Sequence, residues 1–311
     1  MLRQALLQMS KSERVRHLVE TAPVSRSVVA RYVAGAATED GVRAAGELVG
    51  SGRLVTLDHL GEDTLDLRQA QATRDAYLSL LSQLQAAGLT EEGKAEVSVK
   101  LSAVGQALPG DGERVALDHA REICAAAVQA GTTVTLDMED HTTTDSTLSI
   151  LHDLRADFPW VGAVVQAYLR RTEADCRDLA AEGSRVRLCK GAYDEPESVA
   201  YQSNREVDAS YVRCLKVLME GSGYPMVATH HPTLIDIAAA LVTRTKRAQG
   251  SYEFQMLYGI RPDEQRRLAA RGEKMRVYVP YGDQWYGYLM RRMAERPANT
   301  AFFLRSLVTK G

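Results

Sequence analysis

The sequence predicts an α/β fold, a (β/α)8 barrel of the TIM type preceded by an N-terminal helical arm. From Arg53 onward, short runs rich in β-branched residues alternate with amphipathic stretches, a pattern typical of parallel strands joined by crossover helices. Eight such pairs follow one another over about 250 residues, which is the usual size of a closed eight-stranded barrel. We therefore predict a helical arm over residues 1–52 and a catalytic barrel over residues 53–311.

The predicted strands and helices alternate regularly along the chain. The strands cover residues 54–60, 96–103, 133–140, 161–168, 185–193, 225–231, 252–259 and 275–282. The helices cover residues 64–87, 113–130, 145–157, 173–182, 207–220, 233–246, 262–271 and 284–296. An open doubly wound sheet is the alternative. It is disfavoured because no GxGxxG motif follows any of the strands.

The composition is that of an ordinary soluble globular protein, with 311 residues, 45% of them hydrophobic and 25% charged. A net charge of −2 gives no basic excess for binding nucleic acid. The four cysteines form no CxxC pair, which favours a reducing compartment without structural zinc. No apolar run reaches the roughly 18 residues of a membrane span, and the N-terminus lacks a secretory signal. We expect a cytoplasmic enzyme.

Polar residues gather where the predicted strands end, which is where the active site of such a barrel lies. Charges that face the barrel must be paired or must contact a polar ligand, because an isolated buried charge is costly. The residues concerned are Lys100, Ser102, Asp137, Glu139, Asp140, His141, Gln166, Tyr168, Arg185, Arg187, Lys190, Thr229, His230, His231, Glu253, Gln255, Tyr278 and Tyr281.

The last predicted helix carries Tyr288, Arg291, Arg292 and Glu295 at i, i+3, i+4 and i+7, so these side chains share one face. Two adjacent guanidinium groups suit bidentate binding of a carboxylate, and Glu295 can orient them. The alternative is a solvated helix face with an ordinary i,i+4 ion pair.

Several chemistries fit these strand ends. Lys100 or Lys190 could form a Schiff base, as in barrel aldolases. A divalent metal is disfavoured, because Asp137, Glu139, His141, His230 and His231 come from only two strands and show no HxH or HExxH spacing. A barrel that only binds an amino acid is a third possibility. An anionic cofactor with an extended ring explains the lining best, through Arg187, Lys190, Gly191, Gln166, Gln255 and Thr229.

A series of motifs carries a family resemblance. They are VSVKLSA (97–103), LDMED (136–140), RLCKGAY (187–193), ATH (228–230), FQMLYG (254–259), YLMRRMAE (288–295) and ANTAFF (298–303). In this order they resemble the FAD-dependent proline dehydrogenases, of the monofunctional bacterial type. The resemblance covers about two-thirds of the chain, and a fused aldehyde dehydrogenase domain is not expected in 311 residues.

The resemblance implies roles for particular residues. Arg291 and Arg292 would grip the proline carboxylate, with Glu295 orienting them and Lys100 as a third cation. Leu188, Tyr278 and Tyr288 would surround the pyrroline ring, and Asp137 and Arg187 would be the catalytic pair. FAD would be held non-covalently by Met138, Gln166, Arg187, Lys190, Gly191, Ala192, Thr229, His230 and Gln255.

The implied reaction is oxidation of L-proline to Δ1-pyrroline-5-carboxylate, the first step of proline catabolism to glutamate. Hydride would pass to flavin N5 and electrons to a membrane quinone. This implies a cytoplasmic protein in peripheral contact with the inner membrane face, and a transient contact with a separate pyrroline-5-carboxylate dehydrogenase. Two positions depart from the family pattern: His231 stands where many relatives have Asn or Asp, and Trp285 fills a short loop. Tyr278, where hydroxyproline-preferring relatives carry Ser, implies a preference for proline.

Overall fold

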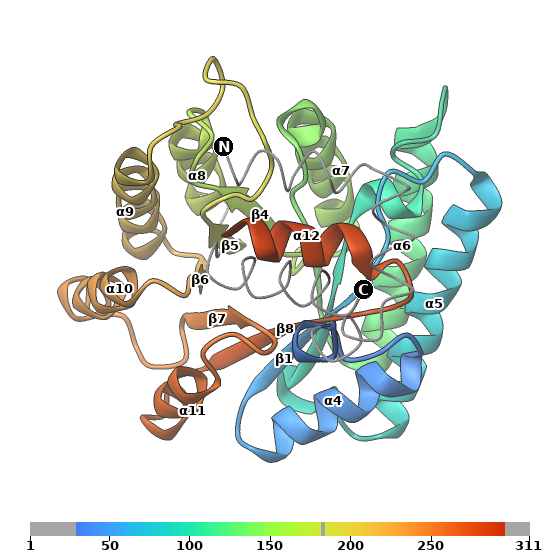
Figure 1. Cartoon of the computed structure of the whole chain (residues 1–311), viewed down its shortest axis with the longest axis horizontal. Helices are drawn as coiled ribbons and strands as arrows, with labels where there is room; N and C mark the ends of the chain where they lie inside the picture. The colour runs from blue at the N-terminus through green and yellow to red at the C-terminus, as the bar shows by residue number, and fades with distance from the viewer. Residues whose placement is uncertain (1–28, 182–183, 296–311) are drawn as a thin grey trace, which may run out of the picture.

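The computed structural model describes residues 29–181 and 184–295, and within them eight parallel strands form one sheet (Figure 1). The strands are β1 (Leu54–His59), β2 (Ala95–Val99), β3 (Val134–Leu136), β4 (Ala163–Gln166), β5 (Arg185–Cys189), β6 (Tyr224–Ala228), β7 (Glu253–Leu257) and β8 (Met275–Tyr281). Each strand lies within its predicted run or begins one residue before it. The predicted order of strands is therefore confirmed.

The sheet closes where β3 meets β4. Its hydrogen-bonded order runs β3-β2-β1-β8-β7-β6-β5-β4, and an isolated parallel bridge joins Thr135 to Gly162. Leu136 N donates to Gly162 O at 2.9 Å, and Gly162 N donates to Val134 O at 2.9 Å. A Cβ at position 162 would lie 2.8 Å from Thr135 Oγ1, so this close approach requires glycine. The (β/α)8 barrel is thus confirmed.

Side chains on the strands alternate between two faces of different character. The outward residues are apolar and pack in the main core beneath the helices, as Val97, Leu188 and Val277 do. The inward residues are polar and almost fully buried on most strands. They include Thr56, Asp58, Glu96, Ser98, Thr135, Asp137, Gln166, Arg187, Glu253, Gln255 and Arg276. The barrel interior is therefore a polar network.

The helices that follow the first seven strands surround the barrel (Figure 1). They are α5 (Leu67–Ala86), α6 (Gly112–Ala130), α7 (Thr144–Asp157), α8 (Thr172–Ala181), α9 (Asn204–Glu220), α10 (Pro232–Thr245) and α11 (Pro262–Ala270). Local signals mark several of their starts. Asp66 accepts from Gln69 N at 3.0 Å, and Ser203 forms a capping box with Glu206 at the start of α9.

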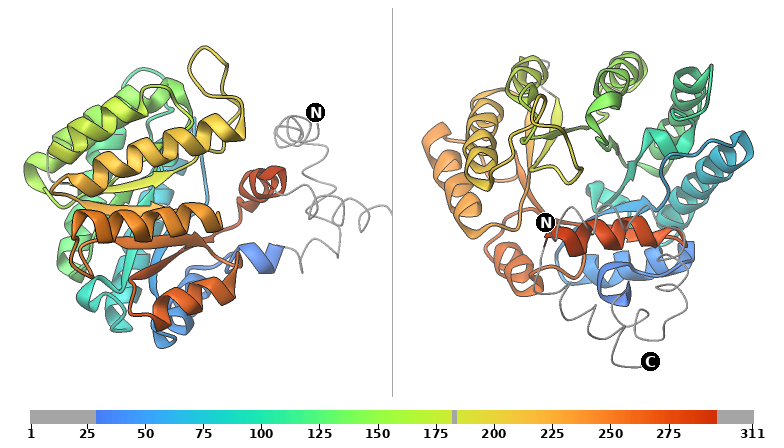
Figure 2. Two further views of the ribbon diagram at one scale, coloured as in Figure 1. Left: turned by 90° about the vertical axis from the view of Figure 1, so that its left-hand side faces the viewer. Right: turned by 45° about the horizontal axis from the view of Figure 1, so that its top comes forward.

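The eighth position of the helical ring is taken by a helix of the arm, α4 (Thr38–Gly50), which packs against β8, β1 and α5. Gly41 of this helix allows close packing, since a Cβ there would lie 3.2 Å from Leu57 Cδ2. The helix after β8, α12 (Trp285–Glu295), instead lies across the mouth of the barrel, beyond the strand ends (Figures 1 and 2). The domain boundary after residue 52 stays a prediction.

A second, smaller hydrophobic cluster lies at this mouth. It is formed by Tyr32, Val33, Leu60, Ile260, Tyr286, Tyr288, Leu289, Met290 and Met293, and we call it the mouth cluster. It joins α12 to the described start of the arm and to two loops that follow strands. No helix in residues 29–181 and 184–295 is both long and apolar enough to span a bilayer.

Candidate active site

Lys100 follows β2, and its ammonium group is held by oxygens from three other strands or strand ends. Its Nζ lies 2.6 Å from Asp58 Oδ2, 3.2 Å from the Tyr278 hydroxyl and 3.4 Å from Asp137 Oδ2. Burial alone would lower the pKa of Lys100, but the carboxylates of Asp58 and Asp137 raise it overall. Lys100 therefore stays cationic. This argues against its use as a Schiff-base nucleophile, which must be deprotonated.

The Asp137 carboxylate is the centre of the polar network at the strand ends. It accepts hydrogen bonds from Ser98 Oγ at 2.6 Å, from the Tyr278 hydroxyl at 2.7 Å and from Arg187 Nη1 at 2.7 Å. Burial alone would raise the pKa of Asp137, but Lys100 and Arg187 lower it overall. The predicted catalytic pair of Asp137 and Arg187 is thus in direct contact, and the Asp137 carboxyl is ionised.

Arg187 also connects this site to the floor of the barrel. Its Nε donates to Gln255 Oε1 at 2.6 Å, and Gln255 Nε2 donates to Glu253 Oε1 at 2.5 Å. Arg276 Nε in turn donates to Glu253 Oε1 at 2.8 Å. Arg187 Nη2 is buried and has no hydrogen-bond partner among the described residues; it lies 4.0 Å from Glu96 Oε1. Arg187 is thus held by partners on β2, β7 and the end of β3, while its Nη2 faces Glu96 inside the barrel.

Glu139 lies two residues beyond Asp137 and is buried, and no cation of the described residues is hydrogen-bonded to its carboxyl group. Its Oε1 accepts from Ser102 Oγ at 2.6 Å, and its Oε2 accepts from Ser102 N at 3.1 Å. Burial raises the pKa of Glu139 to about 7, although the bonds from Ser102 and the charge of Lys100 oppose the rise. Glu139 can therefore exchange a proton near neutral pH.

The α12 helix places Arg291 over the mouth. Its Nη1 donates to Glu62 Oε1 at 2.5 Å, and its guanidinium carbon lies 5.4 Å from the centroid of the Tyr193 ring. Burial would lower the pKa of Arg291, but Glu62 raises it overall. The guanidinium carbon of Arg292 lies 5.3 Å from the centroid of the buried Tyr288 ring.

Glu295, predicted to orient the two arginines, is the last residue of α12. Its side chain lies outside the part of the chain that the structure describes, as does the ANTAFF motif at 298–303. The carboxylate that does contact Arg291 is Glu62, in the loop after β1. That partner was missed by sequence reasoning because 229 residues separate the two positions.

Asp58 and Ser98 were also missed, although a signal for each was present. Asp58 is fully buried at the end of β1, and strand alternation places it on the inward face with Thr56. Ser98 precedes Lys100 by two residues and contacts both Arg187 Nη1, at 2.9 Å, and Asp137. Applying the alternation to the first two strands would have found both.

The residues predicted to hold the cofactor lie at the ends of β3 to β7. Gln166 Nε2 donates to Glu139 O at 2.7 Å, and Thr229 Oγ1 accepts from His231 N at 3.1 Å. The backbone amide of Leu257 donates to His230 Nε2 at 2.9 Å, so the proton of the neutral ring is on Nδ1. The buried Met138 and the partly buried Ala192 complete the group near these strand ends.

Three predicted site residues have surroundings that the sequence did not suggest. Lys190 forms an ion pair with Asp208 of α9, and both side chains are partly exposed. Gly191 has φ 107°, and a Cβ there would meet the Tyr168 ring at 2.1 Å, so packing requires this glycine. Leu188 lies on the opposite face of β5 from Arg187, within the main core, which argues against its predicted contact with a substrate ring.

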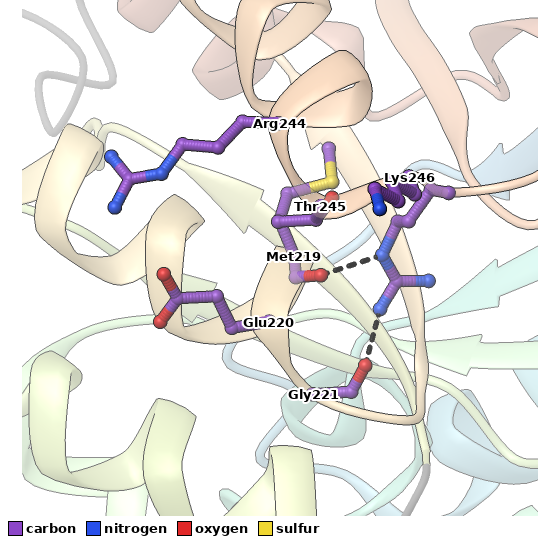
Figure 3. A pocket seen from close by; sticks show the side chains of 7 residues that line it. Met219, Glu220, Gly221, Arg244, Thr245 and Lys246 are labelled. Carbon is purple, nitrogen blue, oxygen red and sulfur yellow. Dashed lines mark hydrogen bonds between the residues drawn. The ribbon is translucent and has the colours of Figure 1, made fainter.

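A hollow of about 430 Å³ lies at the other end of the molecule, between the C-terminal ends of α9 and α10 (Figure 3). Arg247 donates to the carbonyls of Met219 at 2.8 Å and Gly221 at 2.7 Å, and so caps α9. These helix ends precede β6 and β7, so the hollow lies away from the strand ends and is not the candidate site. Its lining residues are Met219, Glu220, Gly221, Arg244, Thr245, Lys246 and Arg247.

Comparison with known proteins places the chain in a family. The proline dehydrogenase family model matches residues 42–305. Proline dehydrogenase 1 of Bacillus subtilis (strain 168) is 38% identical over 280 residues, which cover 90% of each chain. Proline dehydrogenase of Deinococcus radiodurans is 40% identical over 280 residues, which cover 89% of each chain.

Solved structures agree on the fold. Proline utilization A from Bdellovibrio bacteriovorus, inactivated by N-propargylglycine, matches with a TM-score of 0.81 at 24% identity. The match covers all of this chain and 38% of that longer chain. Proline utilization A from Bradyrhizobium japonicum matches 91% of this chain with a TM-score of 0.72. From the family match and the curated relatives, the chain belongs to the proline dehydrogenase family, whose members are oxidoreductases acting on a CH–NH group.

Proposed function

We propose that this protein oxidises L-proline to Δ1-pyrroline-5-carboxylate with a non-covalently bound FAD, and that the electrons then pass to a membrane quinone. The observation that carries the proposal is the position of α12, the helix that carries Arg291 and Arg292, across the mouth of the barrel where Lys100 and Asp137 end their strands (Figure 1). A small zwitterion with one carboxylate suits a site with cations on one side and aromatic rings around them.

The substrate carboxylate would be bound by Arg291 and Arg292, with Lys100 as a third positive charge. Arg291 contacts Glu62 in the present structure, so a bound carboxylate must share or replace that partner. Tyr278 and Tyr288 would flank the pyrroline ring, and Tyr278 would crowd its fourth carbon, favouring proline over hydroxyproline. Glu295 would orient the arginine pair. Asp137 would keep Lys100, Arg187 and Tyr278 in place.

FAD suits the donors that the strand ends provide. Arg187 supplies a buried positive charge, and Lys190 adds a partly exposed cation at the end of β5. Met138, Gln166, Gly191, Ala192, Thr229, His230 and Gln255 would complete the cofactor site. When bound, FAD would accept the hydride from proline at flavin N5.

The protein's own contribution is orientation, exclusion of water and control of one proton. Holding the carboxylate at one end fixes the ring carbon on the far side of the nitrogen. The α12 helix covers the strand ends and limits the entry of water. The proline nitrogen must be the free base before its neighbouring carbon can be oxidised. The cations Lys100, Arg291 and Arg292 favour that form, because like charges disfavour a protonated amine.

The quinone, the peripheral membrane contact and the transient contact with a separate pyrroline-5-carboxylate dehydrogenase are supported by the sequence resemblance. With them we propose a cytoplasmic location in peripheral contact with the inner membrane face. A Schiff-base aldolase is not supported, because Lys100 is paired with two carboxylates and Lys190 with Asp208.

Turnover with defined reactants tests the proposal. The purified protein would be mixed with proline and a short-chain quinone, and the product trapped with 2-aminobenzaldehyde, which gives a coloured adduct with pyrroline-5-carboxylate. We expect adduct and reduced quinone in equal amounts. Protein loaded with FAD that forms neither would refute the proposal. Acid precipitation should also release the flavin into solution, whereas flavin in the pellet would indicate a covalent link.

A further inference from the structure

We infer that residues 29–35 of the arm form a brace that positions α12 and so sets the affinity of the site for the substrate carboxylate. The brace is a set of positioning residues; none of them needs to touch the substrate. The inference rests on the proposed role of Arg291 and Arg292, and the test below separates the two. Three observations carry it.

The first observation is the way α12 is supported. None of the strands β1–β8 or the helices α4–α11 shares extensive contact with α12. Its buried side chains instead pack in the mouth cluster, together with Tyr32 and Val33, which are 5% and 2% exposed. Tyr278 packs against the same cluster. The brace therefore contributes two buried side chains to the mouth cluster, which holds α12.

The second observation is that the backbone of the brace is fixed to the end of β8. Ala34 N donates to Pro280 O at 2.9 Å, and Gly282 N donates to Gly35 O at 2.9 Å. These bonds lie on either side of Tyr281, just before the loop that leads into α12. The brace and the start of α12 are thus tied to the same strand end, as their neighbouring positions in Figure 2 show.

The third observation is a contact that only glycine allows. Gly259, in the loop between β7 and α11, has φ 71°, and a Cβ there would lie 1.7 Å from the carbonyl oxygen of Arg31. Real Cβ atoms essentially never come within 3.0 Å of such an atom, so any side chain at this position must push the brace away. The next residue, Ile260, belongs to the mouth cluster. The brace is therefore held between this loop and β8.

Displacing the brace should misplace the two arginines relative to the strand ends without removing them. An error of about 1 Å in such a position can cost up to about 100-fold in activity. Gly259→Ala is the direct change. Gly52→Ala is its control, because Gly52 has a similar φ of 78° and nothing within 4 Å of its Cβ position. The two variants share the backbone strain and differ in the contact with the brace.

The first readout follows α12 itself and does not depend on the substrate. The chain has two tryptophans, Trp160 near the start of β4 and Trp285 at the start of α12. In a Trp160→Phe background, the fluorescence of Trp285 reports the surroundings of α12. Gly259→Ala should shift this emission and make it easier to quench with acrylamide, whereas Gly52→Ala should not. Equal emission and quenching in both variants would overturn the inference.

The second readout is proline oxidation by the flavin-loaded protein. Gly259→Ala should raise KM for proline about tenfold, with little change in kcat or flavin content, and Gly52→Ala should leave KM unchanged. If the Trp285 emission shifts and KM for proline does not change, the brace positions α12 but α12 does not bind the substrate. That result would refute the proposed role of Arg291 and Arg292. A fall in flavin content with unchanged KM would overturn the inferred effect on the substrate.

A second pair of variants covers the case in which Gly259→Ala does not fold. Val33→Ala removes two methyl groups from the mouth cluster, and Val161→Ala removes the same groups from the main core near the start of β4. Both should lower the melting temperature. Only Val33→Ala should raise KM for proline and alter the Trp285 emission. The same KM in both variants would mean that the brace is merely structural and would refute the inference.

Discussion

Arg291 donates to Glu62 Oε1 at 2.5 Å, and this ion pair joins the helix over the mouth to the loop that follows β1. Both side chains are largely buried, and burial alone would raise the pKa of Glu62, yet Arg291 lowers it overall. Arg291 is therefore already engaged by a carboxylate at the place proposed for the substrate carboxylate. If the proposed role of Arg291 holds, the proline carboxylate would share or replace this partner on binding.

Loss of either α12 arginine should weaken proline binding more than flavin binding. We expect Arg291→Met and Arg292→Met to raise KM for proline steeply, since losing a buried charged hydrogen bond costs about 2–5 kcal/mol. Steady-state kinetics and the ratio of flavin to protein absorbance measure the two effects. Release of the flavin with unchanged KM would reverse the roles proposed for the two groups of residues.

Arg187 should matter first for the cofactor. Arg187→Ala removes a buried cation that we propose lies beside the cofactor, and we expect a lower flavin content after purification. Arg185→Ala is the matched control on the same strand, because Arg185 pairs with Glu96 at 2.5 Å, deeper in the barrel. Both changes leave a buried carboxylate short of a partner and should cost about 3–5 kcal/mol of stability. Equal flavin loss in the two variants would contradict the assignment.

Glu139 should make stability depend on pH in a definite direction. Its pKa of about 7 in the folded protein is above the ordinary value of about 4.3. The folded state thus binds the proton more tightly, so the carboxyl contributes stability at low pH that is lost as the pH rises from about 4 to 7. Glu139→Gln can still accept from Ser102 N through its amide oxygen and can donate to Ser102 Oγ through its NH2 group, and it should remove this dependence.

Urea unfolding at pH 5 and pH 8 measures the effect of Glu139. At each pH, the free energy of unfolding of the wild type is subtracted from that of Glu139→Gln. This difference should be more favourable to the variant at pH 8 than at pH 5, by at most about 3 kcal/mol. The same difference between the two proteins at both pH values would show that Glu139 does not titrate in this range.

Asp58 and Lys100 should be energetically coupled. Asp58→Asn leaves the buried Lys100 without its nearest carboxylate, and we expect a loss of about 3 kcal/mol in the free energy of unfolding. Lys100→Met should lose a similar amount, and the double variant less than the sum of the two. A double-mutant cycle at neutral pH measures the coupling. Additive losses, within about 0.5 kcal/mol, would mean that the pair is not a unit.

Much of the fold could be predicted from the sequence because strand and helix spacing differ. Each predicted strand was found, although β3 is only the three residues Val134–Leu136 of the run at 133–140. The place of the two outer helices could not be predicted. Periodicity shows that α4 and α12 each have a buried face, but it does not show what covers that face. That α4 takes the eighth position of the helical ring, and α12 does not, depends on tertiary packing.

The site was predictable to the extent that its residues end strands. The strand ends bring together one hydrogen-bonded group of Lys100, Asp137, Arg187 and Tyr278, as expected for polar residues at the ends of barrel strands. Contacts between loops and α12 were not predictable, because Glu62 and Arg291 are 229 residues apart in sequence. The brace was missed for the same reason, since Gly259 and the carbonyl of Arg31 are far apart in sequence.

The proposed function requires that proline deliver its hydride to a flavin bound in this barrel. Recording the absorbance spectrum of the purified protein under anaerobic conditions, before and after one equivalent of proline, tests it most directly. We expect an oxidised flavin spectrum that is bleached by proline and restored by a quinone. A protein that carries FAD but keeps its oxidised spectrum with excess proline would contradict the claim.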